Sequence, residues 1–239
     1  MNAMFKSFVL LIALTACDAP TQSSDSAANT ELPAPAAESA NADGVVTIKA
    51  EVWADNWFAF YLGGQLVMED SVPVTTERSF NAEVFTFQAA YPMTFNFIVK
   101  DFKENDTGLE YIGSNRQQMG DGGLIAHFID SHTGDLIAVT DANWACTVIH
   151  EAPLDKSCEK ESSPIAGQVP CNFTALVEPT GWKEDNFDDS SWSKATVYRE
   201  AQVNPRDGYD EIAWDSSAKL IWGPDLETNN TLVCRLTLE

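Results

Sequence analysis

Basic residues are scarce in this 239-residue chain, in which 14 Lys and Arg stand against 36 Asp and Glu and the formal net charge is −22. Nucleic-acid binding needs a basic stripe that neutralises phosphates, so the composition excludes nucleic acid as a partner. An acidic surface also repels anionic lipid headgroups, and any attachment to a membrane must therefore come from outside the domain surface. Such acidity serves solubility as well as cation binding, and the composition leaves these two roles open.

Long apolar runs and helical periodicity are also missing. The N-terminal apolar run, residues 8–13, is too short to span a bilayer, and no segment keeps a helical period over about twelve residues. The chain instead contains short, mostly alternating apolar segments between Gly and Pro turns, which is typical of a sandwich or barrel. The expected strands cover residues 45–53, 57–62, 65–68, 80–88, 93–99, 123–129, 136–140, 219–222 and 231–238, with a hairpin turn at Gly63 and Gly64.

Catalytic motifs are absent from the sequence. The three histidines, His127, His132 and His150, match no Gly-x-Ser-x-Gly or His-Glu-x-x-His pattern. Asp130-Ser131-His132 contains the residue types of a triad, but consecutive residues point in different directions and cannot align a nucleophile with its base. His127 lies in an apolar run and is expected to be a packed strand residue. The chain is therefore not predicted to be an enzyme, although its many carboxylates leave a glycosidase pair as an alternative.

Residues 1–17 have the features of an export signal. Lys6 precedes the apolar run, and the tetrapeptide LTAC, ending at Cys17, places small residues directly before a cysteine. This segment resembles a bacterial lipoprotein signal peptide with its lipobox. The resemblance implies that residues 1–16 are removed and that Cys17 carries a diacylglycerol and an amide-linked acyl group, which anchor the protein to a membrane. An ordinary secretory signal with a chance cysteine is the alternative.

Residues 17–44 are expected to be the lipidated cysteine and a disordered acidic tether. The stretch is almost entirely Ala, Ser, Thr, Pro, Asn, Asp and Glu, without an aromatic residue, and cannot bury enough apolar area to fold. Residues 45–239 are long enough for one sizeable core and keep 31 acidic against 13 basic residues. The expected location is a bacterial envelope membrane, with the domain in the periplasm or at the cell surface. The sequence leaves the choice of membrane open.

Cysteine usage agrees with export, since four cysteines follow Cys17 and disulfides persist outside the cytoplasm. Three pairings are conceivable. Cys158 and Cys171 bracket a loop with Pro and Gly turns, so a local bridge there costs little chain entropy. That bridge leaves Cys146 to pair with Cys234. A zinc site is the competing use, but the thiols lack Cys-x-x-Cys spacing.

Three phrases resemble galactose-binding-like jelly rolls, which are lectin-like β-sandwiches. They are ADNWFAFYLGGQLV (54–67), NFDDSSW (186–192) and the closing segment within 221–235. The resemblance implies an all-β, single-domain jelly-roll sandwich over residues 45–239. One departure is the cysteine-bearing stretch 144–182, which shows no clear strands and is expected to be a long loop insertion.

Paired oxygen donors mark two candidate sites. Asp188 and Asp189 can supply carboxylate ligands to calcium, which is the only cofactor that the sequence suggests. Alternatively, their side chains can accept hydrogen bonds from nearby backbone amides in a turn, after which Trp192 enters the core. Asp55 and Asn56 can likewise hold a cation or a sugar hydroxyl, or cap a turn.

Seven tryptophans offer faces for stacking on sugar rings, and Trp182 and Trp214 lie in polar, turn-rich contexts where exposure is expected. The sequence therefore predicts a non-catalytic binding module, with carbohydrate as the ligand. A structural or protein-interaction lipoprotein without a sugar site is the main alternative. Sugar binding predicts an exposed tryptophan beside Asp or Asn in a hollow.

Overall fold

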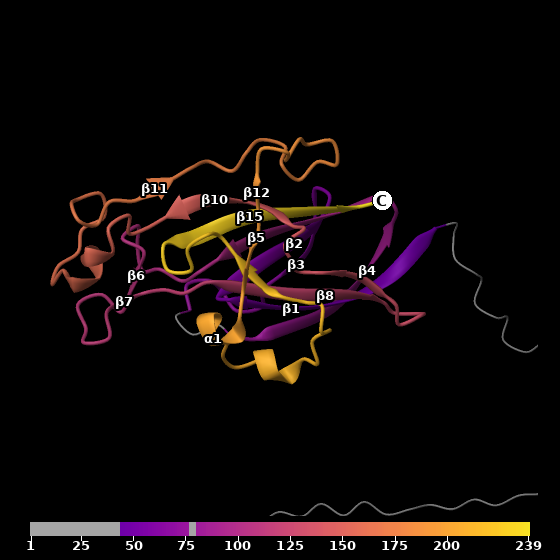
Figure 1. Ribbon diagram of the computed structural model, residues 1–239, viewed down its shortest axis with the longest axis horizontal. Helices are drawn as coiled ribbons and strands as arrows, with labels where there is room; N and C mark the ends of the chain where they lie inside the picture. Colours follow the sequence, from indigo (N-terminus) through magenta and orange to yellow (C-terminus); the bar gives the residue numbers. More distant parts are fainter. Residues whose placement is uncertain (1–43, 77–79) are drawn as a thin grey trace, which may run out of the picture. The chain divides into compact units, whose positions relative to one another are not determined.

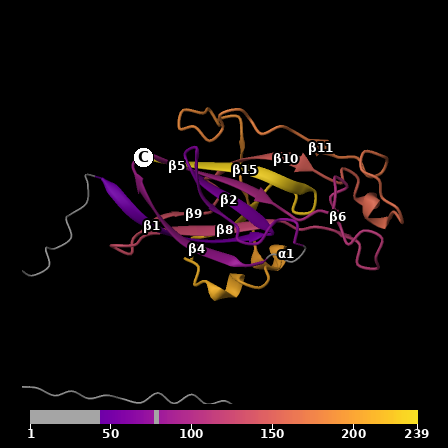
Figure 2. The ribbon, with the colours of Figure 1, turned by 180° about the vertical axis from the view of Figure 1, so that it is seen from behind.

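The computed structural model describes residues 44–76 and 80–239. Cys17, the predicted signal peptide (1–16) and the predicted tether up to residue 43 lie outside these residues. Within the described part of the chain, no helix is long and apolar enough to cross a membrane. The folded part is an all-β sandwich of two antiparallel sheets (Figures 1 and 2).

The first sheet has the strand order β13-β14-β8-β1-β4, and β9 pairs with β8. Its strands are β1 (Val45–Asp55), β4 (Ala82–Ala90), β8 (Gly123–Asp130), β9 (Leu136–Val139), β13 (Thr196–Tyr198) and β14 (Leu220–Trp222). The second sheet has the order β11-β10-β15-β5-β2-β3, and β12 pairs with β10. Its strands are β2 (Trp57–Leu62), β3 (Gln65–Glu69), β5 (Met93–Lys100), β10 (Ala145–Glu151), β11 (Thr174–Ala175), β12 (Ser193–Lys194) and β15 (Asn229–Leu238).

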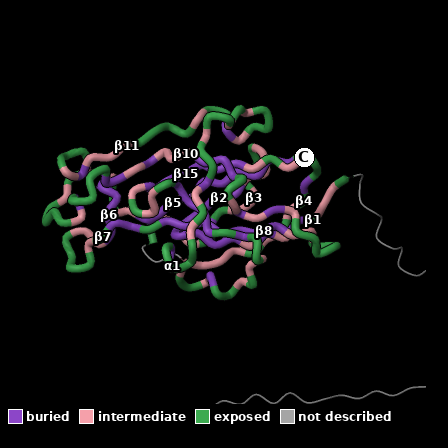
Figure 3. Tube along the Cα trace, in the orientation of Figure 1, coloured by how far each residue is buried: buried purple, intermediate pink, exposed green. Residues whose placement is uncertain are grey.

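The remaining elements are short. β6 (Leu109–Glu110) and β7 (Gln118–Met119) form a separate hairpin, which extends beyond the end of the sheets in Figure 1. The helical turns are η1 (Lys156–Lys160), α1 (Glu200–Val203) and η2 (Tyr209–Glu211). Most buried residues lie in the paired strands, whereas most loop residues are exposed or half-buried (Figure 3).

Phenylalanines from both sheets fill the space between them. Phe60 of β2 is fully buried, and its ring centroid lies 5.0–5.8 Å from those of five other phenylalanines. These neighbours are Phe85, Phe87, Phe95, Phe97 and Phe128. Each such aromatic pair adds about 0.5–1.5 kcal/mol beyond simple burial, so this cluster joins the sheets strongly.

Alternating apolar residues predicted the principal strands correctly. The hairpin of β2 and β3 is confirmed, and Gly63 at its turn has a φ of +52°, a value that glycine adopts without strain. The expectation that residues 144–182 form a long loop without clear strands is wrong at the start of this stretch, because β10 pairs with β15 along most of its length. Its polar and half-buried residues mask the alternation, which is why the pattern was weak.

Both predicted disulfides are confirmed. Cys146 and Cys234 are bonded at paired positions of β10 and β15, and Cys158 and Cys171 close a local loop. The first bridge lies in the core between the sheets, while the second lies in a small separate cluster with Leu109 of β6. Oxidised cysteines agree with an extracytoplasmic protein.

The segment from Glu178 to Lys194 covers part of the outer face of the second sheet (Figure 1). Trp182, Phe187 and Trp192 pack there against outward-facing residues of β2, β5 and β15. Trp192 therefore enters this outer cluster and not the core between the sheets, contrary to the sequence-based expectation.

Candidate functional site

Asp55 and Asn56, the candidate ligand-binding pair, lie where β1 ends and the chain crosses to β2. Asn56 fastens this crossover: its Oδ1 accepts from the backbone N–H of Phe102 at 2.6 Å, and its backbone N–H donates to the carbonyl of Lys100 at 2.9 Å. The end of β5 is thereby held next to the crossover, and Asp101 comes within electrostatic range of Asp55.

A polar hollow opens beside this crossover. We call it the carboxyl pocket; it has a volume of about 690 Å³ and is lined by Asp55, Asn56, Glu110, Asp121, Asn204 and Arg206, among others. These residues come from β1, the β6–β7 region and the loop after α1, which are far apart in the sequence. Tyr111 and Phe80 add aromatic surface to the lining, and the Arg116 guanidinium lies 3.9 Å from the Tyr111 ring centroid.

Asp55 is the least compensated group of the carboxyl pocket. The residue is only 4% exposed, and among the described residues no donor forms a hydrogen bond with its carboxylate. Burial raises the pKa of Asp55 well above its usual value near 3.8, and the negative charges of Asp121 and Asp101 raise this pKa further. The Arg206 guanidinium lowers it only in part. A buried carboxyl group facing a hollow without a protein partner is available to a ligand.

Asp101 contributes negative charge near Asp55 and is itself buried. Burial, followed by the charges of Glu110 and Asp121, raises the pKa of Asp101 well above its usual value. Asn230 donates a weak hydrogen bond to it at 3.4 Å. Its carboxylate also packs on the α-carbon of Gly120, where an added Cβ would lie 2.1 Å from Oδ2. Only glycine leaves room for Asp101 at this position.

We predict that Asp55→Asn makes the protein more stable at neutral pH. The pKa of Asp55 is higher in the folded state than in the unfolded state. Its contribution to the free energy of unfolding is therefore complete below the unfolded-state pKa near 3.8, and it is lost as the pH rises through the folded-state pKa. The variant should exceed the wild type in free energy of unfolding by about 1–3 kcal/mol near pH 7, and the difference should vanish near pH 4. Urea denaturation at both pH values measures this.

Asp188→Asn is the matched control. Asp188 is exposed, and hydrogen bonds from Ser190 lower its pKa, so its substitution should not stabilise the protein at neutral pH. Equal responses of the two variants would contradict the prediction for Asp55.

The calcium hypothesis for Asp188 and Asp189 gains no support from their contacts. Asp188 accepts a hydrogen bond from the backbone of Ser190 at 3.0 Å, and Asp189 accepts one from the Nε of Arg235 at 3.0 Å. These are the bonds of a turn and an ion pair. Over residues 44–76 and 80–239, no group of three His, Cys, Asp or Glu side chains is placed to hold a metal ion.

The expected exposure of Trp182 is wrong. Trp182 is 3% exposed, and its indole N–H donates to Glu178 at 3.0 Å, because the segment that carries it folds onto the second sheet. Trp214 is half-buried, and its indole N–H donates to the carbonyl of Tyr209 at 3.0 Å. All seven tryptophans are buried or half-buried, and neither Trp182 nor Trp214 lines the carboxyl pocket. The aromatic surface beside Asp55 is that of Tyr111 and Phe80.

His127 and His132 make structural contacts. His127 is a buried residue of β8, as expected; its Nε2 contacts Glu51, and its Nδ1 accepts from the backbone N–H of Asp215. Asp130 accepts from the backbone N–H of His132 at 2.7 Å and so forms a turn.

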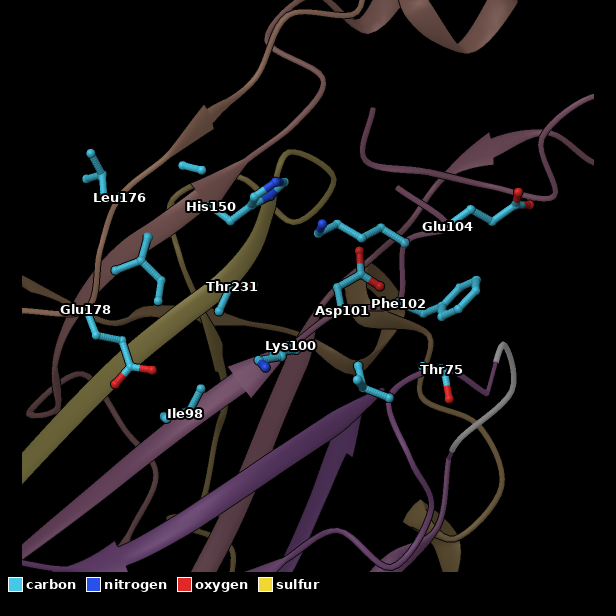
Figure 4. Close-up of a pocket in the computed structure, with 14 residues that line it drawn as sticks. Thr75, Ile98, Lys100, Asp101, Phe102, Glu104, His150, Leu176, Glu178 and Thr231 are labelled. Atoms are coloured by element: carbon cyan, nitrogen blue, oxygen red, sulfur yellow. The ribbon is translucent and has the colours of Figure 1, made fainter. Parts of the chain in front are cut away.

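A second hollow lies on the outer face of the second sheet, next to Asp101 (Figure 4). We call it the β5 groove; it has a volume of about 780 Å³, and its lining includes Ile98, Lys100, Asp101, Ile149, Leu176 and Thr231. Asp101 lines the β5 groove, and its negative charge also raises the pKa of Asp55 in the carboxyl pocket.

Comparison of the chain with protein-family models, with curated proteins and with solved structures finds no match. The assignment of a site therefore depends on the geometry described above.

Sequence reasoning identified Asp55 and Asn56 but missed Asp101, Glu110 and Arg206 as their neighbours. One signal was present: Asp101 directly follows an apolar strand, and Asp55 is the last residue of another. The pairing of Trp57 with Lys100, which places the two strand ends together, was not deducible from either segment alone.

Proposed function

We propose that this protein is a lipid-anchored envelope lipoprotein whose sandwich is a non-catalytic carbohydrate-binding module, with the ligand in the carboxyl pocket. The observation that carries the proposal is Asp55, a buried carboxyl group that faces a polar hollow and has no hydrogen-bond partner among the described residues. Buried polar groups are ordinarily paired, and exceptions cluster at functional sites.

The chemistry of the lining suits a polyhydroxylated ligand. Sugar hydroxyls both donate and accept hydrogen bonds, and the carboxyl pocket offers carboxylate acceptors, the amides of Asn204 and Gln118, and the guanidinium donor of Arg206. Tyr111 and Phe80 offer apolar contact to C–H groups at the same hollow. A ligand held in this way replaces the solvent that Asp55 lost on folding.

The finer fold assignment, a galactose-binding-like jelly roll, also belongs to the proposal. Its support is the order of the three phrases along the chain, together with the hairpin of β2 and β3 that the first phrase predicted. Lipid attachment at Cys17 is supported by the lipobox-like segment, and export is supported by the two disulfides.

A glycan array with the wild-type protein, run with and without calcium, tests the proposal. We expect binding of at least one glycan in both conditions, and a loss of about tenfold or more in affinity for Asp55→Ala, since a buried polar partner is removed from the ligand. Asp188→Ala, an exposed carboxylate outside the carboxyl pocket, is the control and should bind as the wild type does. Absence of binding by folded wild-type protein would overturn the proposal.

Catalysis is the second candidate function, favoured by one observation. Two carboxyl groups with raised pKa values, Asp55 and Asp121, line the carboxyl pocket, and glycosidases use such a group as general acid. If the wild type hydrolyses an array ligand, and Asp55→Asn binds that ligand without hydrolysing it, the protein is an enzyme and not a non-catalytic binding module.

A structural or protein-interaction role remains the rival from another class. The burial or half-burial of all seven tryptophans favours it over a lectin that stacks sugars on an indole. In the same array experiment, this rival predicts no glycan bound in either condition.

A further inference from the structure

The β5 groove is the part of the second sheet's outer face that the segment from Glu178 to Lys194 leaves open. Outward-facing residues of three adjacent strands form its floor: Ile98 of β5, Thr231 of β15 and Ile149 of β10. Leu176, which follows β11, forms one wall and is 59% exposed. The apolar lining at this face is therefore aliphatic, with Thr231 of β15 between Ile98 and Ile149.

Lys100 is the uncompensated charge of the β5 groove. Its ammonium lies 4.8 Å from the ring centroid of Trp57, and no carboxylate among the described residues forms an ion pair with it. In a domain with 31 acidic and 13 basic residues, a half-buried lysine without an acidic partner is unusual. Figure 4 places Lys100 next to Ile98 and Thr231, at the apolar floor.

The other charged groups of the groove have partners of their own. The ammonium of Lys103 pairs with Asp106 at 2.7 Å, and the carboxylate of Glu178 accepts from the indole of Trp182 at 3.0 Å and lies 3.6 Å from Lys183. Glu104 accepts from the backbone of Ile112 at 2.6 Å, and its side chain extends away from Lys100 in Figure 4.

His150 and Asp101 line the same end of the groove, and burial disfavours the charged form of each. Burial lowers the pKa of His150, and its ring is held by Asn230 at 3.0 Å and Asp106 at 3.1 Å. Burial also raises the pKa of Asp101, which weakens any repulsion of an anion.

We propose that the β5 groove binds an aliphatic monoanion, with its carboxylate on the Lys100 ammonium and its chain along Ile98, Ile149 and Leu176. Charge complementarity selects the anion, because Lys100 is the one cation without a carboxylate partner among the described residues that line the groove, and it lies beside the apolar floor. The aliphatic floor selects a chain over a sugar ring, which stacks better on aromatic faces. This site is separate from the carboxyl pocket and does not depend on carbohydrate binding.

Calorimetric titration with sodium decanoate and with decanol tests the proposal. The full chain carrying Cys17→Ser is used, because this change removes the predicted lipidation site and the need for detergent. Decanoate should bind about tenfold more tightly than decanol, and its affinity should fall as the salt concentration rises. Lys100→Met, which keeps the length of the side chain, should abolish the preference for decanoate.

Three further variants make the result specific. Lys160→Met removes an exposed lysine outside the groove and should leave decanoate binding unchanged. Leu176→Asn, at an exposed wall position, should weaken decanoate and decanol alike. Asp55→Asn should leave both affinities unchanged, which separates this proposal from the one on carbohydrate. Equal binding of decanoate and decanol, or full decanoate affinity in Lys100→Met, would overturn the inference.

Discussion

Replacement of Arg235 by Met is expected to lower the free energy of unfolding by about 3–5 kcal/mol, the usual cost of removing one partner from a buried ion pair. Arg235 is 1% exposed, and its Nε donates to Asp189 at 3.0 Å. Its Nη1 donates to the carbonyl of Glu184 at 3.0 Å and to that of Trp182. Without the guanidinium, these acceptors lose their donor in a largely buried site.

The same change should release the segment from Glu178 to Lys194 from the second sheet. Urea denaturation measures the loss of stability, and limited tryptic digestion at Lys183 measures the release. Arg235→Lys, which keeps the charge but not the planar fork of donors, should show an intermediate loss.

Arg199→Met provides the matched control for this result. Arg199 is exposed, and the Nε of its side chain bonds only Gln202 among the described residues, so its removal should change stability by less than about 0.5 kcal/mol. A similar loss in both variants would show that Arg235 does not hold the segment.

Removal of the bridge between Cys146 and Cys234 should destabilise the protein more than removal of the bridge between Cys158 and Cys171. The first joins residues 88 apart and the second joins residues 13 apart. Chain entropy alone gives about 4–5 kcal/mol for the former and about 3 kcal/mol for the latter. Cys146 and Cys234 also lie in the core, where truncation leaves a cavity that adds to the loss.

Paired Cys→Ala variants, compared by urea denaturation, measure this difference. A larger loss for the pair at 158 and 171 would contradict the chain-entropy account. It would show instead that the small cluster around Leu109 contributes more to stability than the core bridge does.

The strands were largely predictable because alternation is a local property. In β1, Ile48, Ala50 and Val52 alternate toward the core, and any sheet that buries one face of the segment requires this pattern. β10 was missed because Thr147 and Glu151 interrupt its apolar positions, and its place in the sheet depends on pairing with β15, far away in the sequence.

The candidate site was predictable only in part. Asp55 and Asn56 were recognisable as oxygen donors at the end of a strand, yet the same residue types at 188 and 189 proved to form a turn and an ion pair. Trp182 was misplaced because its polar neighbours suggested exposure, whereas the residue packs on the outer face of the sheet and its carbonyl accepts from Arg235.

Composition and local pattern thus accounted for the all-β class, most strand positions and the local disulfide between Cys158 and Cys171, because each depends on chain-local geometry or on simple loop entropy. The bridge between Cys146 and Cys234 then followed by elimination. The two hollows arose from contacts between remote segments. The end of β5 meets the crossover after β1 and thereby desolvates Asp55, and partial coverage of the second sheet leaves Lys100 beside an open apolar floor. Such burial depends on which distant surfaces meet, and no local pattern in the chain contains that information.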